Sequence, residues 1–422
     1  MIIQRLFYVG LCCQLFGESR GFLVQNPRSS PAAVSSCKQH GTSSPLQHAD
    51  TDTATFNNLF SEFENDLNRL SQLRPPLPSS DPSLHATLIS AGSSYTRLWT
   101  ASTWVQHSRP PHSRYARHIW RWRHSSTAKK VLPAVLISTA WATLVSVSPH
   151  YFKWSEQILA SAGSVAAATS VLLAPLALLL TLRANCSLGR LLEARLLWGR
   201  MVLHTRTLAS LMQVYLLPHA PKTTLAAARL LAILSWQLKA YVRGESVELQ
   251  REALNTTLDK ETVDWILDET QQPYQKSIVT IPSRIRQLCH AAMNHMEQEK
   301  QPNIPQYQVE NEICKLEEVV GGCERLHSSP IPPTYSRHLS RVMALFNLTF
   351  PISLVSAGVN PFGVIVVSMI ASYVFIGIDE VGMEIENAFQ LLPLQQLAAA
   401  SQKAVLDQFL FMRNGPPLVT EK

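Results

Sequence analysis

The sequence predicts an all-α membrane protein with four transmembrane helices per subunit that continue into a soluble helical region. Three stretches of the 422-residue chain carry no charged residue: 131–152, 157–182 and 342–378. A helix needs roughly 20 apolar residues to cross the hydrocarbon core of a bilayer, so the first two stretches are each about one span long and the third nearly two. No segment shows a convincing alternation of apolar and polar residues, as a half-buried strand would.

The predicted membrane helices cover about 131–148, 158–182, 342–357 and 361–378. The third stretch is divided at Ser356 to Pro361 ("SAGVNP"), a Gly/Asn/Pro turn signal. The alternative is a large soluble protein with buried core helices. It is disfavoured because core helices rarely run this long without a charge on one face.

The positive charge of the chain is explained by membrane orientation. A net charge of +7 would suggest a nucleic-acid partner in a soluble protein. Here the basic residues flank the start of the first helix and the end of the second, in Ser113–Lys130 and at Arg183, Arg190, Arg195 and Arg200. The loop between these helices offers only Lys153 against Glu156. By the positive-inside tendency, the termini and the long middle segment face the cytosol or its organellar equivalent, and no nucleic-acid partner is expected.

Trp120 and Trp122 lie among these arginines. We interpret them as part of an aromatic belt at the membrane surface, where amphipathic rings gather. The alternative, a platform on which RNA bases stack, is the less frequent use of such a pattern.

Residues 1–55 are predicted to be a targeting leader. A basic residue precedes an apolar core from Leu6 to Phe16, which is a signal-peptide layout. The following segment is rich in Ser, Thr, Pro, Ala and His, as transit peptides are, and Phe22 follows the signal as in bipartite plastid leaders. An ordinary secretory signal followed by a disordered tail is the alternative.

The remaining chain divides into a linker, a channel-sized helical domain and a short tail. Residues 56–110 mix a short helical pattern with a Pro/Ser run, so we predict a largely disordered linker with one or two amphipathic turns. Residues 111–412 form the main domain, and 413–422 a C-terminal tail. Helical spacing of apolar residues predicts soluble helices within about 185–330, at 185–217, 226–242, 261–269, 283–299 and 310–324.

No catalytic or metal-binding motif is recognisable. The seven cysteines include no CxxC pair, and a disulfide between Cys314 and Cys323 remains open. The chain has no ligand motif among His204, His290, His295 and His338, and it has neither a phosphate-binding glycine loop nor a GxSxG sequence. We expect no enzyme, no cofactor and no metal.

Two segments resemble the bestrophin-like anion channels. "LLAPLALLLTLRANCSLGRLLEARLLWGRMVLHTRTLA" (Leu172–Ala209) is similar to the second membrane helix of that family. "IPPTYSRHLSRVMALFNLTFP" (Ile331–Pro351) and "IGIDEVGMEIENAFQLLPL" (Ile376–Leu394) are similar to its third and fourth helices. The resemblance covers about residues 110–412 and is nearest to the chloroplast branch, which includes the thylakoid chloride channel of plants and algal bestrophin-like proteins.

The resemblance implies a homopentamer with one central pore. It places three apolar rings of a narrow neck at Ala174, Leu178 and Leu182, with Pro175 bending the helix. A ring of Arg183 with Asn185 would attract anions. We interpret Arg190 and Arg195 as structural charges that pair with Glu193 and neighbouring acids, and the same structural role is the alternative for Arg183. The family has aromatic residues at Leu182, Leu188 and Leu191, so pore width stays open.

An acidic cluster follows the fourth predicted membrane helix at Asp379, Glu380, Glu384 and Glu386. Carboxylates at this spacing could hold a divalent cation. The calcium-gated animal bestrophins use an acidic run just beyond this point, and the equivalent "ENAFQLLPLQQ" lacks one. We therefore expect no calcium gating, and we interpret these acids as ion-pair partners of Arg337 and Arg341.

Taken together, these patterns predict a channel that conducts chloride and other small monovalent anions across a plastid membrane, with the thylakoid as the expected one. The plasma membrane or another endomembrane is the alternative location. A bicarbonate channel that supplies the thylakoid lumen is the alternative of the same class. A non-conducting membrane scaffold with the same fold is the alternative of another class. Membrane lipid and further copies of the chain are the expected partners.

Overall fold

The computed structural model describes residues 50–72, 98–108, 110–120, 122, 125–152, 156–267, 277–294 and 304–414. The predicted leader up to residue 49, the Pro/Ser run of the linker and most of the predicted tail lie outside the described residues. Apart from Asp50, the first residue of the first helix, the helices belong to the compact unit that begins at Thr51. Every regular element of the described residues is a helix, which confirms the predicted all-α class.

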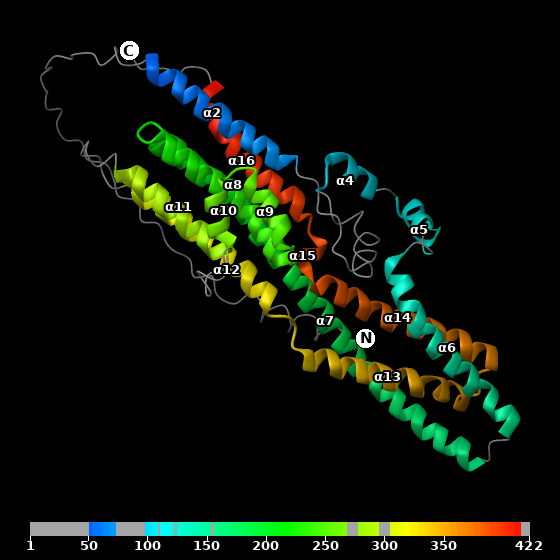
Figure 1. The fold of residues 1–422 in the computed structure, drawn as a ribbon. Coiled ribbons are helices and arrows are strands. Elements are labelled where there is room, and N and C mark those ends of the chain that lie inside the picture. The colour runs from blue at the N-terminus through cyan, green and yellow to red at the C-terminus, as the bar shows by residue number, and fades with distance from the viewer. Residues whose placement is uncertain are drawn as a thin grey trace, which may run out of the picture. The chain divides into compact units, whose positions relative to one another are not determined.

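Figure 1 shows the helices in chain order. Their bounds are α2 Asp50–Ser71, α4 Ala101–His107, α5 Pro111–Trp120, α6 Ser126–Phe152, α7 Glu156–Leu211, the π-helix η2 Met212–Leu216, α8 Pro221–Arg243, α9 Val247–Asn255, α10 Lys260–Leu267, α11 Ser277–Asn294, α12 Ile304–Ser328, α13 Pro333–Ser356, α14 Pro361–Glu386, α15 Ala388–Leu391 and α16 Leu394–Asn414.

Four helices contain the segments predicted to cross the membrane: α6, α13, α14 and the first half of α7. Each is long and apolar enough to do so. Both α13 and α14 pack against α6 and α7. Large apolar side chains on their outer surfaces remain exposed, among them Ile137 (73%), Val171 (73%) and Phe362 (77%). Apolar surface of this extent is not left to water, so this is a multi-pass membrane protein.

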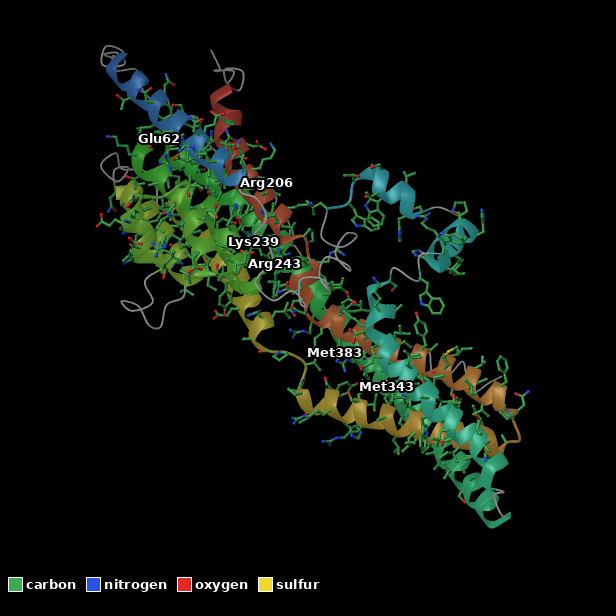
Figure 2. The ribbon with its side chains drawn as sticks, turned by 45° about the vertical axis from the view of Figure 1, so that its right-hand side comes forward. Glu62, Arg206, Lys239, Arg243, Met343 and Met383 are labelled. Carbon is green, nitrogen blue, oxygen red and sulfur yellow. The ribbon has the colours of Figure 1, made fainter. Side chains whose placement is uncertain are left out.

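Helix α8 is also long and apolar enough to cross a membrane, but it lies in the protein core. Sixteen of its 23 residues are buried, and it packs between α11 and α16 (Figure 1). The buried Lys239 binds Gln395 (2.9 Å) and Glu245 (3.1 Å), and Figure 2 shows it inside this bundle. Protein therefore covers the apolar surface of α8, and the helix belongs to the predicted soluble region.

Helix α7 runs without a break through Leu182, where the predicted membrane span ends. The predicted continuation as an amphipathic helix from about 185 to 217 is confirmed by α7 and η2, which end at Leu216. On its second half, Ala194, Trp198, Met201 and Thr205 are buried, and that side packs against α12 and α16. One rigid element thus joins the membrane part to the soluble bundle.

The segment that begins the predicted linker is instead part of the core. In place of one or two amphipathic turns, the structure has the 22-residue helix α2. Its Phe60, Phe63, Leu67 and Leu70 are each at most 1% exposed and join the main hydrophobic core. Their spacing of three and four residues puts them on one helix face. The sequence pattern showed that face but not the bundle surface that covers it.

The position of α2 is compatible with the predicted processing site. We expect the mature chain to begin between about Gly21 and Thr55, because cleavage beyond Phe60 would remove an aromatic pair from the core. Phe60 and Phe63 have ring centroids 6.0 Å apart, and Phe63 lies 5.4 Å from Phe409. Amino-terminal sequencing of the native protein measures this. An intact Met1, or a start inside α2 after Phe60, would contradict the prediction.

Candidate ion pathway

The three predicted neck residues lie on one face of α7. Ala174 is exposed, and Leu178 and Leu182 are 60% and 45% exposed. The opposite side of the helix carries Leu176 and Leu180, which are buried against Leu339, Met343 and Phe346 of α13. Within the described part of the protomer, the neck face therefore has no covering helix. It faces lipid, a neighbouring subunit or an aqueous pathway.

Pro175 and Asn185 flank the neck residues. Pro175 lies inside α7 without ending it. Because proline has no backbone N–H, the carbonyl of Val171 lacks its usual helical donor, and a local bend there remains a prediction. Asn185 is exposed and lies three residues beyond Leu182, so it continues the same face.

Arg183 points to the opposite side of α7 and is only 2% exposed. Its Nη1 lies 2.9 Å from Asp379 Oδ1, and its Nη2 lies 3.7 Å from Glu386 Oε2. The same guanidinium contacts the sulfur of Met383, which Figure 2 labels on α14. Of the two roles considered for Arg183, this geometry corresponds to the structural ion pair: the charge is neutralised inside one protomer.

Helix α14 is shaped for this contact. Asp379, Gly382, Met383 and Glu386 are spaced three, four and seven residues apart, so they share one helix face. A Cβ on Gly382 would lie 3.4 Å from Cδ of Arg183, an ordinary van der Waals contact, so the arginine stem packs closely against α14 at this position. No role was predicted for Gly382 or Met383. The seven-residue spacing of Asp379 and Glu386, which puts both acids on one helix face, is the sequence signal from which this site could have been predicted.

The other carboxylates of the cluster also pair differently from the prediction. Glu380 lies 3.4 Å from Lys130 of α6, and no ion pair of Glu384 is present among the described residues. Arg337 and Arg341, predicted to be the partners of these acids, are exposed on α13, where Arg337 binds the carbonyl of Pro333. The acids have other partners because α14 packs most extensively against α6 and α7. These two helices carry Lys130 and Arg183.

Arg190 caps helix ends instead of pairing with Glu193. Its guanidinium donates to the carbonyl oxygens of Ser329 (2.5 Å) and Leu326 (2.8 Å), at the end of α12, and to that of Glu386 (3.4 Å). Unpaired carbonyls at a helix C-terminus favour a cation. Glu193 pairs with Arg325 of α12. Arg195 is exposed and has no ion pair within the described ranges, so the predicted pairs along α7 do not form.

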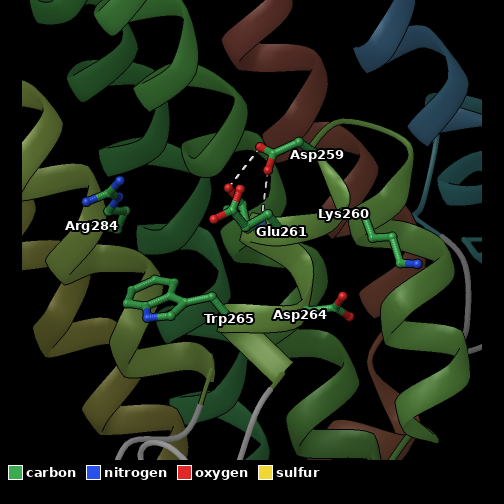
Figure 3. Close-up of a pocket in the computed structure, with 7 residues that line it drawn as sticks. Asp259, Lys260, Glu261, Asp264, Trp265 and Arg284 are labelled. Carbon is green, nitrogen blue, oxygen red and sulfur yellow. Dashed lines mark hydrogen bonds between the residues drawn. The ribbon is translucent and has the colours of Figure 1, made fainter.

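Figure 3 shows a surface pocket of about 990 Å³ beside α10 and α11. Two of its charged residues, Asp259 and Arg284, serve the local fold. The backbone N–H of Thr262 donates to Asp259 (3.0 Å), which lowers the pKa of that carboxyl and caps the start of α10. Arg284 lies over the ring of Trp265, 5.9 Å from its centroid. This pocket is open to solvent, and none of its lining residues belongs to α7.

Thiols and metal ligands do not form a reactive centre in the part of the chain that the structure describes. No group of three or more His, Cys, Asp or Glu residues there could hold a metal. Cys314 and Cys323 are both free, so the disulfide left open by the sequence is not formed. Burial raises the pKa of Cys289 to about 12, which keeps this thiol protonated and unreactive at neutral pH.

Comparison with known proteins identifies the family. Residues 103–407 match the family described as Bacterial/Fungal Bestrophin protein. A bestrophin homologue from Klebsiella pneumoniae, solved as single-residue variants, is similar to this chain at 27% identity with a TM-score of 0.56. A second variant gives 26% and 0.57. The first match covers 66% of this chain and 98% of the bacterial one; the second covers 68% and 99%.

Curated relatives carry channel names. A voltage-dependent anion channel-forming protein of Synechocystis is 29% identical over 55% of this chain and 74% of its own length. Voltage-dependent chloride channel 2, chloroplastic, of Arabidopsis thaliana is 25% identical over 72% of this chain and 70% of its own. These relatives are channels, not enzymes. Since the family match spans well over half of the sequence, including all four membrane helices, the chain belongs to the bestrophin family.

Proposed function

We propose that this protein is an anion channel that passes chloride and other small monovalent anions through a homopentameric pore. The observation that carries the proposal is the uncovered apolar face of α7 at Ala174, Leu178 and Leu182. In a family whose relatives are named as anion channels, this face is suited to line a narrow neck. An apolar constriction can gate by losing its water, while polar groups beyond it favour the ion.

The second half of α7 supports assembly with further copies of the chain. Leu192 and Leu196 are 62% and 55% exposed although they lie beyond the predicted span, and Leu188 and Leu203 are 44% and 46% exposed. A row of exposed leucines outside the lipid is unfavourable in a monomer. Five copies around an axis would cover part of this row and would place five α7 helices around one pathway.

A plastid membrane is the proposed location. Two relatives from Arabidopsis thaliana are named as chloroplastic, in keeping with the predicted leader. The residues just before α6 also have the features of a membrane surface. The indole N–H of Trp122 donates to the hydroxyl of Tyr373 on α14 (2.8 Å), while the neighbouring Trp120 is 88% exposed. The thylakoid is the first membrane to test.

Reversal potentials of the purified protein in liposomes test the function. We expect currents that reverse near the chloride potential under a potassium chloride gradient, because the relatives are named as anion and chloride channels and the inner half of α7 carries exposed arginines that attract anions and repel potassium. Replacing chloride with nitrate or bicarbonate then ranks the anions and tests the bicarbonate alternative. No current under any gradient would favour the non-conducting scaffold and contradict the proposal.

The topology can be tested with single cysteines. We expect both termini and the segment from Arg183 to Arg341 on one side, so a cysteine at Lys260 on α10 and one at Val359 should label from opposite faces. Val359 lies in the exposed turn between α13 and α14. The exposed native thiols Cys186 and Cys314 are first replaced by serine. Labelling of both sites from the same face would rule out this arrangement.

Channel opening should not require calcium. The acids nearest the membrane boundary are already engaged, since Asp379 and Glu386 pair with Arg183, and Glu380 with Lys130. Each protein cation competes with a divalent ion for the same oxygens. Single-channel recordings with and without a chelator measure this. Currents that vanish on chelation and return with calcium would contradict it.

A further inference from the structure

Helix α7 carries a second set of arginines whose charge is not used inside the protomer. Arg183 and Arg190 are bound to α14 and to helix ends. Arg195, Arg200 and Arg206 are exposed, and no ion pair of theirs is present among the described residues. If the pore face of α7 carries a cation, it must come from this second set.

Helical geometry selects one of the three. Eighteen residues make about five full turns, so positions 18 apart lie on the same side of a continuous helix. The neck residues Ala174, Leu178 and Leu182 therefore project onto Leu192, Leu196 and Arg200. Because α7 is unbroken from Glu156 to Leu211, this projection holds along its length. Arg195 and Arg206 lie about 100° and 80° around the helix axis from Leu178, so they are on the flank of α7 and not on the face of the neck residues.

Arg200 is the one charged residue on this face between Ala174 and Leu211. The residues within about 40° of Leu178 are otherwise apolar or neutral: Ala174, Leu182, Asn185, Gly189, Leu192, Leu196, Leu203, Thr207 and Ser210. Glu193 lies just outside the face, and its carboxylate is paired with Arg325. The exposed guanidinium of Arg200 thus has no acid on its own face to neutralise it.

We infer that Arg200, and not Arg183, supplies the ring of positive charge that gathers anions at the inner mouth of the pore. The inference rests on the proposed pentameric channel. Arg200 lies about 27 Å beyond Leu182 along the helix axis. That exceeds the Debye length of about 8–10 Å at physiological salt, so the ring does not act on the neck itself. It raises the anion concentration in the vestibule that feeds the neck.

The test compares Arg200→Gln with Arg195→Gln and Arg200→Lys in single-channel recordings. At about 20 mM chloride we expect Arg200→Gln to lower by roughly threefold the current carried by anions entering from the α7 C-terminal side. At about 1 M salt, where screening is nearly complete, the difference should disappear. Arg200→Lys keeps the charge and should retain the parent current. Arg195→Gln removes an exposed arginine from the flank and should do the same.

The outcomes separate this inference from the proposed function. A parent channel that conducts, with an Arg200→Gln current equal to it at low salt, overturns the inference alone. An equal loss in Arg195→Gln overturns it too, since position on the face would then not matter. A parent protein that carries no anion current overturns the proposed function. Gel-filtration profiles matching the parent show that each variant assembles, because both arginines are exposed at the surface of the protomer.

Discussion

Replacing Arg183 with glutamine should lower the free energy of unfolding by about 3 kcal/mol, because it leaves two carboxylates at the membrane boundary without their cation. Arg183 is 2% exposed, and its partners Asp379 and Glu386 are each 16% exposed in their side chains. Thermal unfolding of the detergent-solubilised protein and its gel-filtration profile measure the change. Earlier melting with loss of the assembled form is the expected result.

Two comparisons make this result specific. Arg183→Gln combined with Asp379→Asn and Glu386→Gln should recover most of the loss, because no buried charge is then left unpaired. Arg195→Gln, a change to an exposed arginine of the same helix, should leave stability unchanged. If Arg183→Gln is as stable as the parent, the ion pair is not structural, and a direct role in anion attraction regains support.

The same geometry changes the expectation for Arg183→Glu. A pore-facing ring predicts weaker selectivity for anions over cations in this variant. In the structure, a glutamate here would meet Asp379 and Glu386 at close range, and like charges in a buried site are strongly repelled. We therefore expect loss of assembled channel before any change of selectivity can be recorded.

Shortening Leu178 to alanine should raise the anion current several-fold. The side chain is 60% exposed, so its removal opens no cavity within the protomer and costs little stability. In a pentamer it would replace five isobutyl groups by methyl groups in one ring of the neck, and a wider apolar constriction wets more readily. Single-channel conductance in planar bilayers measures this. Leu182→Ala should act in the same direction.

Leu173 provides the matched control. It is also an exposed leucine of α7, at 46%, but it lies about 140° around the helix from Leu178. Leu173→Ala should conduct like the parent, because the same atoms are removed from a side that does not line the pathway. If Leu178→Ala and Leu182→Ala also conduct like the parent, α7 does not line the pore.

The helices themselves were predictable because their signals are local. Charge-free stretches of the right length predicted α6, α13, α14 and the first half of α7, and helical spacing predicted the continuation of α7 beyond Leu182. For α8, composition alone does not distinguish a membrane span from a core helix, because the helix is apolar enough for a span. In the structure it is enclosed by α11 and α16. For α2, the buried face was visible in the sequence, but the surface that covers it comes from distant segments such as Phe409.

The fold class, the family and the face of α7 that carries Ala174, Leu178 and Leu182 all follow from the amino-acid sequence, because apolar length and helical periodicity depend on neighbours along the chain. The role of each charged side chain, in contrast, depends on how the helices pack in three dimensions. Arg183 and Arg200 look alike in sequence, one residue type on one helix. The first is buried against Asp379 and Glu386, about 200 residues away, while the second is exposed. Ion-pair partners are set by which helices pack together, and helix packing is a long-range property that spacing along one segment does not encode.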